Sequence, residues 1–99
     1  MYAASKAALE SFAKTVASEY AHKKIRANCI SPAMVKTPMY DYSSEGEFKA
    51  AMDKHVAQYP LGVGYPQDVA NAIIFLLSPA SRWITGINML MDGGFIFSQ

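Results

Sequence analysis

The sequence predicts an α/β fold in which helices cover a sheet of parallel strands. Two patterns alternate along the 99 residues: stretches in which apolar side chains recur every three or four positions, and short apolar runs bounded by turn-forming residues. Their order is helix, strand, helix, helix, strand, which is typical of helices that connect the strands of one sheet. Two strands alone would leave both sheet edges unpaired, so the pattern corresponds to half of a layered architecture.

The first expected element is a long helix from Tyr2 to about Tyr20. Its many alanines favour a helix and allow close approach to a neighbouring element. A strand is expected next, from Ile25 to Ile30, because this run is β-branched and mostly apolar and comes before Pro32. The positions at helical spacing, expected to form the buried stripe of the helix, are Leu9, Phe12, Ala13, Val16 and Tyr20.

Two more helices are expected in the second half of the chain. The Ser-x-x-Glu pattern from Ser44 to Glu47 is typical of a capping box, and the helix that it begins would run to about Gln58. The third helix is expected from Pro66, a residue type favoured at the first helical position, through Leu77.

A last strand is expected from Ile87 to Met91, between two turns. Ile84-Thr85-Gly86 predicts the turn before the strand, and Asp92-Gly93-Gly94 predicts the turn after it.

The composition indicates one small globular domain. Hydrophobic residues make up 52% of the chain and charged residues 17%, which predicts a packed core. The net charge of +1 gives no single-sign field to hold nucleic acid or an anionic membrane. The longest apolar run, from Ala72 to Leu77, is too short to span a bilayer. Cys29 is the only cysteine, so no internal disulfide can form and a cytoplasmic protein is expected.

Tyr2 and Lys6 are the residues best suited to catalysis. They lie four positions apart on the first helix, so they project from one face about one turn from each other. A desolvated ammonium beside a phenol stabilises the phenolate, which suits Tyr2 to act as a general acid or base on a carbonyl or alcohol. The spacing is not specific by itself, because Tyr20 and Lys24 repeat it.

Several blocks of the chain, in order, resemble the short-chain dehydrogenase/reductase family. Residues 2–9 (YAASKAAL) resemble the family's Tyr-x-x-x-Lys active-site helix, and residues 25–32 resemble the strand after it. Residues 32–37 (PAMVKT) resemble the Pro-Gly-x-Val-x-Thr cofactor loop. The start of the penultimate helix is matched by residues 60–70, and the last strand and its turn by residues 84–94.

The resemblance implies a fold and an activity. The fold is the C-terminal portion of a Rossmann-like doubly wound parallel sheet with its first half missing, so that residues 1–99 are a C-terminal fragment of a single domain. The activity is hydride transfer between a nicotinamide cofactor, NAD or NADP, and a carbonyl compound or secondary alcohol. Tyr2 would exchange a proton with the substrate oxygen and also contribute to cofactor binding, while Lys6 would assist it and hydrogen-bond the nicotinamide ribose.

The resemblance also assigns roles to the loop after the first strand. Val35 would contact the nicotinamide carboxamide through its backbone, and Thr37 would hydrogen-bond the carboxamide or a phosphate. Pro32 and Ala33 would shape the wall beside the nicotinamide ring. Ala33 stands where the family usually has Gly, so this turn must have a negative φ or carry strain.

Other parts of the family pattern belong before the active-site Tyr, where only Met1 stands here. They are the glycine-rich phosphate turn, the residue that selects NAD or NADP, the structural Asn and the catalytic Ser. We therefore expect the chain alone to be inactive. The full-length protein is expected to bind a small-molecule substrate and to form a homo-oligomer, a dimer or tetramer. The alternative is a non-catalytic fragment that acts as an oligomerisation or interaction module.

The remaining candidates have structural interpretations. His22 and His55 have no acidic or cysteine partner at metal-ligand spacing, so no metal site is expected. Cys29 is expected in the core. Residues that fill gaps or face substrate are expected among Met34, Met39 and Met52 and, in the segment that covers the substrate in the family, among Tyr40, Tyr42, Phe48 and Tyr59.

Overall fold

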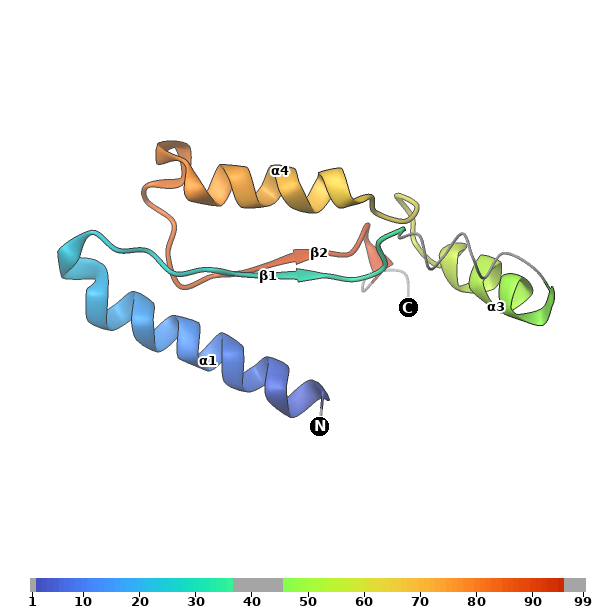
Figure 1. Ribbon diagram of the computed structural model, residues 1–99, viewed down its shortest axis with the longest axis horizontal. Helices are drawn as coiled ribbons and strands as arrows, with labels where there is room; N and C mark the ends of the chain where they lie inside the picture. The colour runs from blue at the N-terminus through green and yellow to red at the C-terminus, as the bar shows by residue number, and fades with distance from the viewer. Residues whose placement is uncertain (1, 37–45, 96–99) are drawn as a thin grey trace. The chain divides into compact units, whose positions relative to one another are not determined.

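The elements follow the order that the sequence predicts (Figure 1). The structure is a computed structural model, and it describes residues 2–36 and 46–95. Within these ranges the α-helices and strands are α1 (Tyr2–Tyr20), β1 (Cys29–Pro32), α3 (Gly46–Val56), α4 (Pro66–Leu77) and β2 (Asn88–Met91), and Ala21–Lys23 and Pro79–Ser81 form short 3-10 helices.

The chain divides into two compact units. Unit 1 contains Met1–Ser31 and Ile73–Met89, and unit 2 contains Pro32–Ala72 and Leu90–Gln99. Both strands and α4 cross from one unit to the other.

Strands β1 and β2 are neighbours in a parallel sheet, with their arrows in the same direction (Figure 1). The N–H of Cys29 donates to the carbonyl of Ile87, and the N–H of Ala33 donates to the carbonyl of Met91, both at 2.9 Å. The donors and the acceptors advance together by four residues, as a parallel register requires. The predicted parallel α/β architecture is therefore confirmed.

The first strand lies later in the chain than the sequence predicts. The prediction is Ile25 to Ile30, whereas β1 is Cys29–Pro32. The preceding residues bond to a turn instead of a strand: the Ala27 N–H donates to the Thr85 hydroxyl at 3.1 Å, and the Ala27 carbonyl accepts from Gly86 at 2.8 Å. Hydrogen bonds to a turn replace the regular ladder there, so the strand starts only at Cys29.

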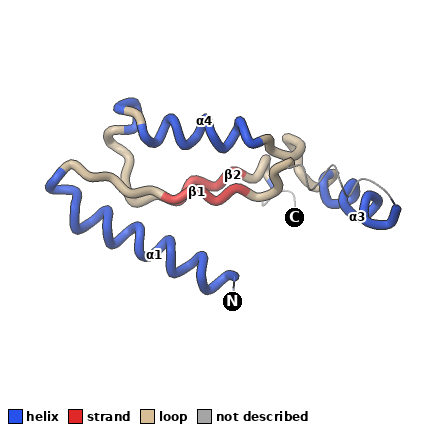
Figure 2. Tube along the Cα trace, viewed as in Figure 1, coloured by secondary structure: helices blue, strands red, loops and turns tan. Residues whose placement is uncertain are grey.

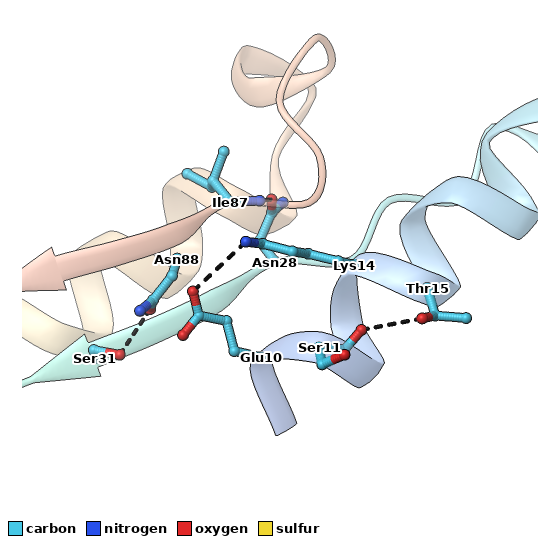
Figure 3. Close-up of polar contacts among 8 residues, drawn as sticks. All are labelled: Glu10, Ser11, Lys14, Thr15, Asn28, Ser31, Ile87 and Asn88. Atoms are coloured by element: carbon cyan, nitrogen blue, oxygen red, sulfur yellow. Dashed lines mark hydrogen bonds and ion pairs between the residues drawn. The ribbon is translucent and has the colours of Figure 1, made fainter. Parts of the chain in front are cut away.

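Two side-chain contacts align the strands in unit 1 (Figure 3). The Ser31 hydroxyl donates to Oδ1 of Asn88 at 2.7 Å, and Ser31 is buried. The Asn28 amide donates to the Ile84 carbonyl at 3.3 Å, and its oxygen accepts from the N–H of Ile87 at 3.1 Å. Among the described residues, no buried side-chain nitrogen or oxygen lacks a hydrogen-bond partner.

Helix α1 does not bury the stripe that its apolar spacing predicts. Leu9 is 63% exposed and Phe12 is 66% exposed, whereas Ala17 is 5% exposed. A Cβ placed on Gly86 would lie 3.6 Å from the Ala17 Cβ, so α1 approaches the turn before β2 at two small residues. The small side chain of Ala17 and the absence of a side chain at Gly86 leave room for this approach.

Helix α4 begins and ends as the sequence predicts, and Figure 1 shows α1 and the C-terminal half of α4 on opposite sides of the strands. Its buried residue is Leu76. The carbonyl of Leu76 accepts from Nη2 of Arg26 at 2.8 Å and from the hydroxyl of the buried Ser81 at 2.9 Å. These donors satisfy a carbonyl that the end of a helix leaves without an intrahelical partner.

Unit 2 contains α3 and the turns around it. Helix α3 ends at Val56, slightly before the predicted Gln58, and Tyr59 follows in a turn. The Tyr59 ring is buried and stacks on Phe95 at a centroid distance of 4.7 Å. His55 contacts both rings, at 5.5 Å and 5.6 Å. Ser44, the start of the predicted capping box, lies outside the described residues.

Among the described residues, no helix is both long and apolar enough to cross a membrane.

Candidate active site

The predicted catalytic pair belongs to unit 1. Helix α1 begins at Tyr2, and Lys6 follows one turn later with an exposed side chain. The side chain of Tyr2 lies outside the described part of the structure. The general acid/base role of this pair therefore stays a prediction.

Residues of the predicted cofactor loop lie at the carboxyl end of β1, in unit 2. Pro32 is the last residue of β1, and its lack of an N–H costs no ladder bond, because Cys29 and Ala33 donate toward β2. Among the described non-glycine residues only Lys24 has a positive φ, so Ala33 has a negative φ. The sequence allows either a negative φ or a strained turn at Ala33, and the structure has the negative φ without strain. Thr37 lies outside the described residues.

Val35 is held in an extended conformation by a parallel bridge to Gly64. The bridge uses the groups on either side of Val35: the Gly64 N–H donates to the Met34 carbonyl at 2.9 Å, and the Lys36 N–H donates to the Gly64 carbonyl at 2.8 Å. Because successive residues of an extended chain direct their backbone groups to opposite sides, the N–H and C=O of Val35 face away from Gly64. A donor and an acceptor on the same residue can pair with a primary carboxamide, whose carbonyl oxygen accepts and whose NH2 group donates.

A cavity of about 490 Å³ lies in unit 2. Its walls include Pro32 and Val35 from the predicted cofactor loop, together with Leu90 and Met91 from the end of β2. Figure 2 shows both strands running into loops at this end. In open parallel sheets, ligands bind outside the carboxyl ends of the strands, and this volume suits a small organic molecule or ring.

The rest of the cavity lining was not identified from the sequence. It includes Leu61, Gly64 and the first turn of α4, together with Tyr59, one of the aromatic candidates. Met34, a candidate for substrate contact, also lines the cavity. No sequence pattern groups these lining residues, because they come from separate segments that only the folded chain brings together.

Two carboxylates line the same cavity, those of Asp68 and Asp92. Oδ2 of Asp68 accepts from the N–H of Tyr65 at 2.7 Å, a capping bond at the start of α4. Oδ1 of Asp92 accepts from the N–H of Gly94 at 3.0 Å. The lining described here includes no Lys, Arg or His side chain.

Several other candidates lie away from this cavity. His22 is exposed, Cys29 is half-buried and Met52 is half-buried on α3. Within the described ranges, no three His, Cys, Asp or Glu side chains gather as a metal site. Met39, Tyr40, Tyr42 and the side chain of Phe48 fall outside what the structure describes.

Comparison with known proteins decides the family. A family model described as enoyl-(acyl carrier protein) reductase matches residues 1–96. The crystal structure of an oxidoreductase of the short-chain dehydrogenase/reductase family from Burkholderia thailandensis superposes with a TM-score of 0.85 at 40% identity. The chain belongs to the short-chain dehydrogenase/reductase family. The match covers 97% of this chain and 38% of that one.

The curated relatives of the chain include proteins named for reductases. A hydroxynaphthalene reductase-like protein of Metarhizium anisopliae is 42% identical, over 97% of this chain and 40% of its own length. A tropinone reductase homolog of Arabidopsis thaliana is 38% identical, over 95% of this chain and 35% of its own length. The chain thus spans about two fifths of the length of the relatives it matches.

The similar solved structures include a complex with NADH. It is a 4-hydroxyisoleucine dehydrogenase complexed with NADH, 35% identical, with a TM-score of 0.84 over 99% of this chain and 40% of that one. The structural similarity establishes that this chain has the architecture of part of a Rossmann-like sheet.

Proposed function

We propose that the protein carrying this chain is an NAD(P)-dependent oxidoreductase acting on a carbonyl compound or secondary alcohol. The observation that carries the proposal is the cavity at the carboxyl ends of β1 and β2, walled by Pro32 and Val35 of the loop that matches the family's cofactor loop. The NADH bound to a related dehydrogenase supports a nicotinamide cofactor. In this proposal, residues 1–99 supply the C-terminal part of a single Rossmann-like domain.

The residues present fit a nicotinamide ring. When bound, the cofactor supplies the hydride donor or acceptor. Val35 would hold the carboxamide through the N–H and C=O that face away from Gly64. Pro32, which lines the cavity, would form a wall beside the ring, together with Ala33, which is not among the lining residues described. The proposed role of Thr37 is a hydrogen bond to the carboxamide or a phosphate.

Tyr2 would transfer a proton to or from the substrate oxygen. Lys6, one helical turn away, would favour the phenolate and hydrogen-bond the ribose of the cofactor. The remaining proposals are a small-molecule substrate, a homo-oligomeric full-length protein and a cytoplasmic location.

Replacing the tyrosine tests the proposed chemistry. Activity is measured in the polypeptide that carries this chain in its source, with NADH or NADPH and a panel of ketones. We expect Tyr2→Phe to lower kcat by about 10²-fold or more, because the variant loses the proton that the substrate oxygen needs, while NADH binding by fluorescence is retained. Lys6→Met is expected to lower kcat and also to weaken NADH binding.

Tyr20→Phe is the matched control, since Tyr20 and Lys24 have the same spacing at the other end of α1. It should leave kcat unchanged. Full activity of Tyr2→Phe would contradict the role assigned to Tyr2.

The exposed apolar side chains of unit 1 favour a second candidate, a non-catalytic oligomerisation or interaction module. Leu9 and Phe12 are exposed on α1, and Trp83 is 92% exposed after α4. A failure to bind NADH, together with association in gel filtration, would favour this candidate.

A further inference from the structure

Three aromatic rings meet around a residue that lines the cavity of unit 2. The Tyr59 ring is 8% exposed and stacks on Phe95 at a centroid distance of 4.7 Å and an interplanar angle of 23°. His55, in the last turn of α3, meets Tyr59 edge-on at 5.5 Å and Phe95 at 5.6 Å. Because stacked and edge-on contacts favour particular ring orientations, Tyr59 is held both by α3 and by the turn after β2.

Tyr59 begins a stretch of chain, residues 59–64, that we call the wall segment. Tyr59 and residues 61–64 all line the cavity. The N–H of Gly62 donates to the Tyr59 carbonyl at 2.9 Å, so the wall segment starts with a turn. Glycine loses more conformational freedom on ordering than any other residue. A wall segment with glycines at positions 62 and 64 therefore depends on contacts that anchor it.

The wall segment is anchored along its length. At its end, Gly64 forms the parallel bridge to Val35, whose outward N–H and C=O are the groups proposed to hold the nicotinamide carboxamide. At its start, Tyr59 is held by its ring contacts, and between them the Leu61 N–H donates to the Gly93 carbonyl at 3.0 Å. A shift of Tyr59 would therefore move the chain that carries the bridge partner of Val35.

We propose that Tyr59 is a positioning residue of the nicotinamide site. Stacking on Phe95 fixes its ring, and the wall segment that follows fixes Val35 in the orientation that a carboxamide requires. This inference rests on the proposed function, because it takes Val35 as the residue that binds the carboxamide. The ring of Tyr59 has this role and its hydroxyl does not, which distinguishes positioning from a hydrogen bond of the hydroxyl to substrate.

The test compares variants that keep or remove the ring, made in the polypeptide that carries this chain. Tyr59→Phe keeps the stacking on Phe95, whereas Tyr59→Leu removes it. If Tyr59→Leu does not fold, Phe95→Leu replaces it with the same expectations, because it removes the stacking partner. Tyr65→Leu is the matched control, since Tyr65 follows Gly64 but is 55% exposed and is not among the lining residues described.

NADH and its 3-acetylpyridine analogue report on the Val35 contact. In the analogue a methyl group replaces the carboxamide NH2, so the hydrogen bond to the Val35 carbonyl is lost. We expect the wild-type protein to bind NADH about tenfold more tightly in fluorescence titrations, the effect of one hydrogen bond. Tyr59→Leu should bring the two dissociation constants to within about twofold, while Tyr59→Phe and Tyr65→Leu keep the wild-type ratio. A general loss of stability would weaken both ligands alike and leave the ratio unchanged.

Hydrogen exchange measures the bridge without a cofactor. The N–H groups of Gly64 and Lys36 make its two hydrogen bonds, so their exchange rates report on its opening. In mass spectrometry resolved to single residues, Tyr59→Leu should raise both rates several-fold relative to Tyr59→Phe. The N–H of Cys29, which bonds to β2 in unit 1, should keep its rate.

The outcomes distinguish this inference from the proposed function. The inference stands only if Tyr59→Leu changes both readouts and Tyr59→Phe changes neither. Equal binding of NADH and its analogue by the wild-type protein also overturns it, because Val35 then makes no contact with the carboxamide NH2. If NADH binds to none of the proteins, the proposed function fails. Exchange at Gly64 and Lys36 then decides whether Tyr59 fixes Val35, and equal rates in Tyr59→Leu and Tyr59→Phe overturn it.

Discussion

At the scale of single residues, Gly93 shows how a turn after a strand closes the cavity. Its φ is +57°, and a Cβ built on it would lie 2.9 Å from the carbonyl oxygen of Gly62. Its own carbonyl accepts from the N–H of Leu61 at 3.0 Å. The turn therefore contacts the cavity wall through backbone atoms, and only a residue without a Cβ fits between them.

Two glycine variants measure this contact. Gly93→Ala is expected to lower the free energy of unfolding by about 2–4 kcal/mol, from a positive φ and from the overlap with a backbone oxygen. Gly62→Ala is the control, since Gly62 has a φ of +78° but nothing within 4 Å of an added Cβ, so it should cost only about 1 kcal/mol. Urea unfolding followed by circular dichroism measures both, and equal losses would show that the overlap is relieved.

Arg26 connects three backbone carbonyls in unit 1. Its guanidinium donates to the carbonyls of Leu76 at 2.8 Å, Ile84 at 3.1 Å and Ser78 at 3.3 Å. Guanidinium suits this task because it presents several donors in a fixed plane, which the single ammonium of lysine cannot.

Truncating Arg26 should therefore destabilise the fold. Arg26→Met is expected to lower the free energy of unfolding by about 2 kcal/mol or more, because partly buried carbonyls lose charged donors, and Arg26→Lys should recover part of the loss. Arg82→Met, at an exposed arginine after α4, should change stability by less than about 0.5 kcal/mol. Similar losses at Arg26 and Arg82 in chemical denaturation would contradict the structural role of Arg26.

At the scale of elements, the sequence predicts helix bounds well where a long apolar pattern or a typical helix-terminal residue marks them. The bounds of α1 and α4 agree with the sequence because alanine-rich spacing and a proline at the first helical position are local signals. The start of β1 was wrong because strand pairing depends on a partner distant in sequence. Ala27 bonds to Thr85 and Gly86 in a turn, which no pattern within residues 25–30 contains.

At the scale of the whole molecule, exposed apolar side chains are the main feature. Among the described residues, the buried apolar side chains are Ala17, Tyr59 and Leu76, whereas Leu77 is 80% exposed and Trp83 is 92% exposed. Exposed apolar surface of this extent favours association with another chain or segment.

Expressed by itself, the 10.8 kDa chain should bind a hydrophobic dye such as ANS and elute from gel filtration as an associated species. The emission of Trp83, the only tryptophan, should be readily quenched by acrylamide if its side chain stays outside the associated surface. A soluble monomer with a sharp unfolding transition would contradict this prediction.

The mass of the polypeptide in its source, detected with an antibody to residues 92–94, identifies the species in which the catalytic variants are tested.

The candidate site was predicted in part. The sequence motifs pointed to Pro32 and Val35, and both line the cavity, but the carboxylates of Asp68 and Asp92 were not anticipated. The sequence around Asp68 indicates a helix cap, and the sequence around Asp92 indicates a turn. Neither local pattern indicates that the side chain lines a cavity. Their common site exists only after distant segments come together.

By itself, the sequence determined the order and type of the elements, the glycine turns and the family, because each depends on spacing or residue type along the chain. The tertiary structure decided that Ala17 and Leu76 are buried while Leu9 and Phe12 are exposed, and that β1 starts at Cys29. The physical reason is that burial and strand pairing depend on the atoms of another segment. Periodicity identifies an apolar face, but the size and position of the neighbouring backbone determine which residue on the helix is buried.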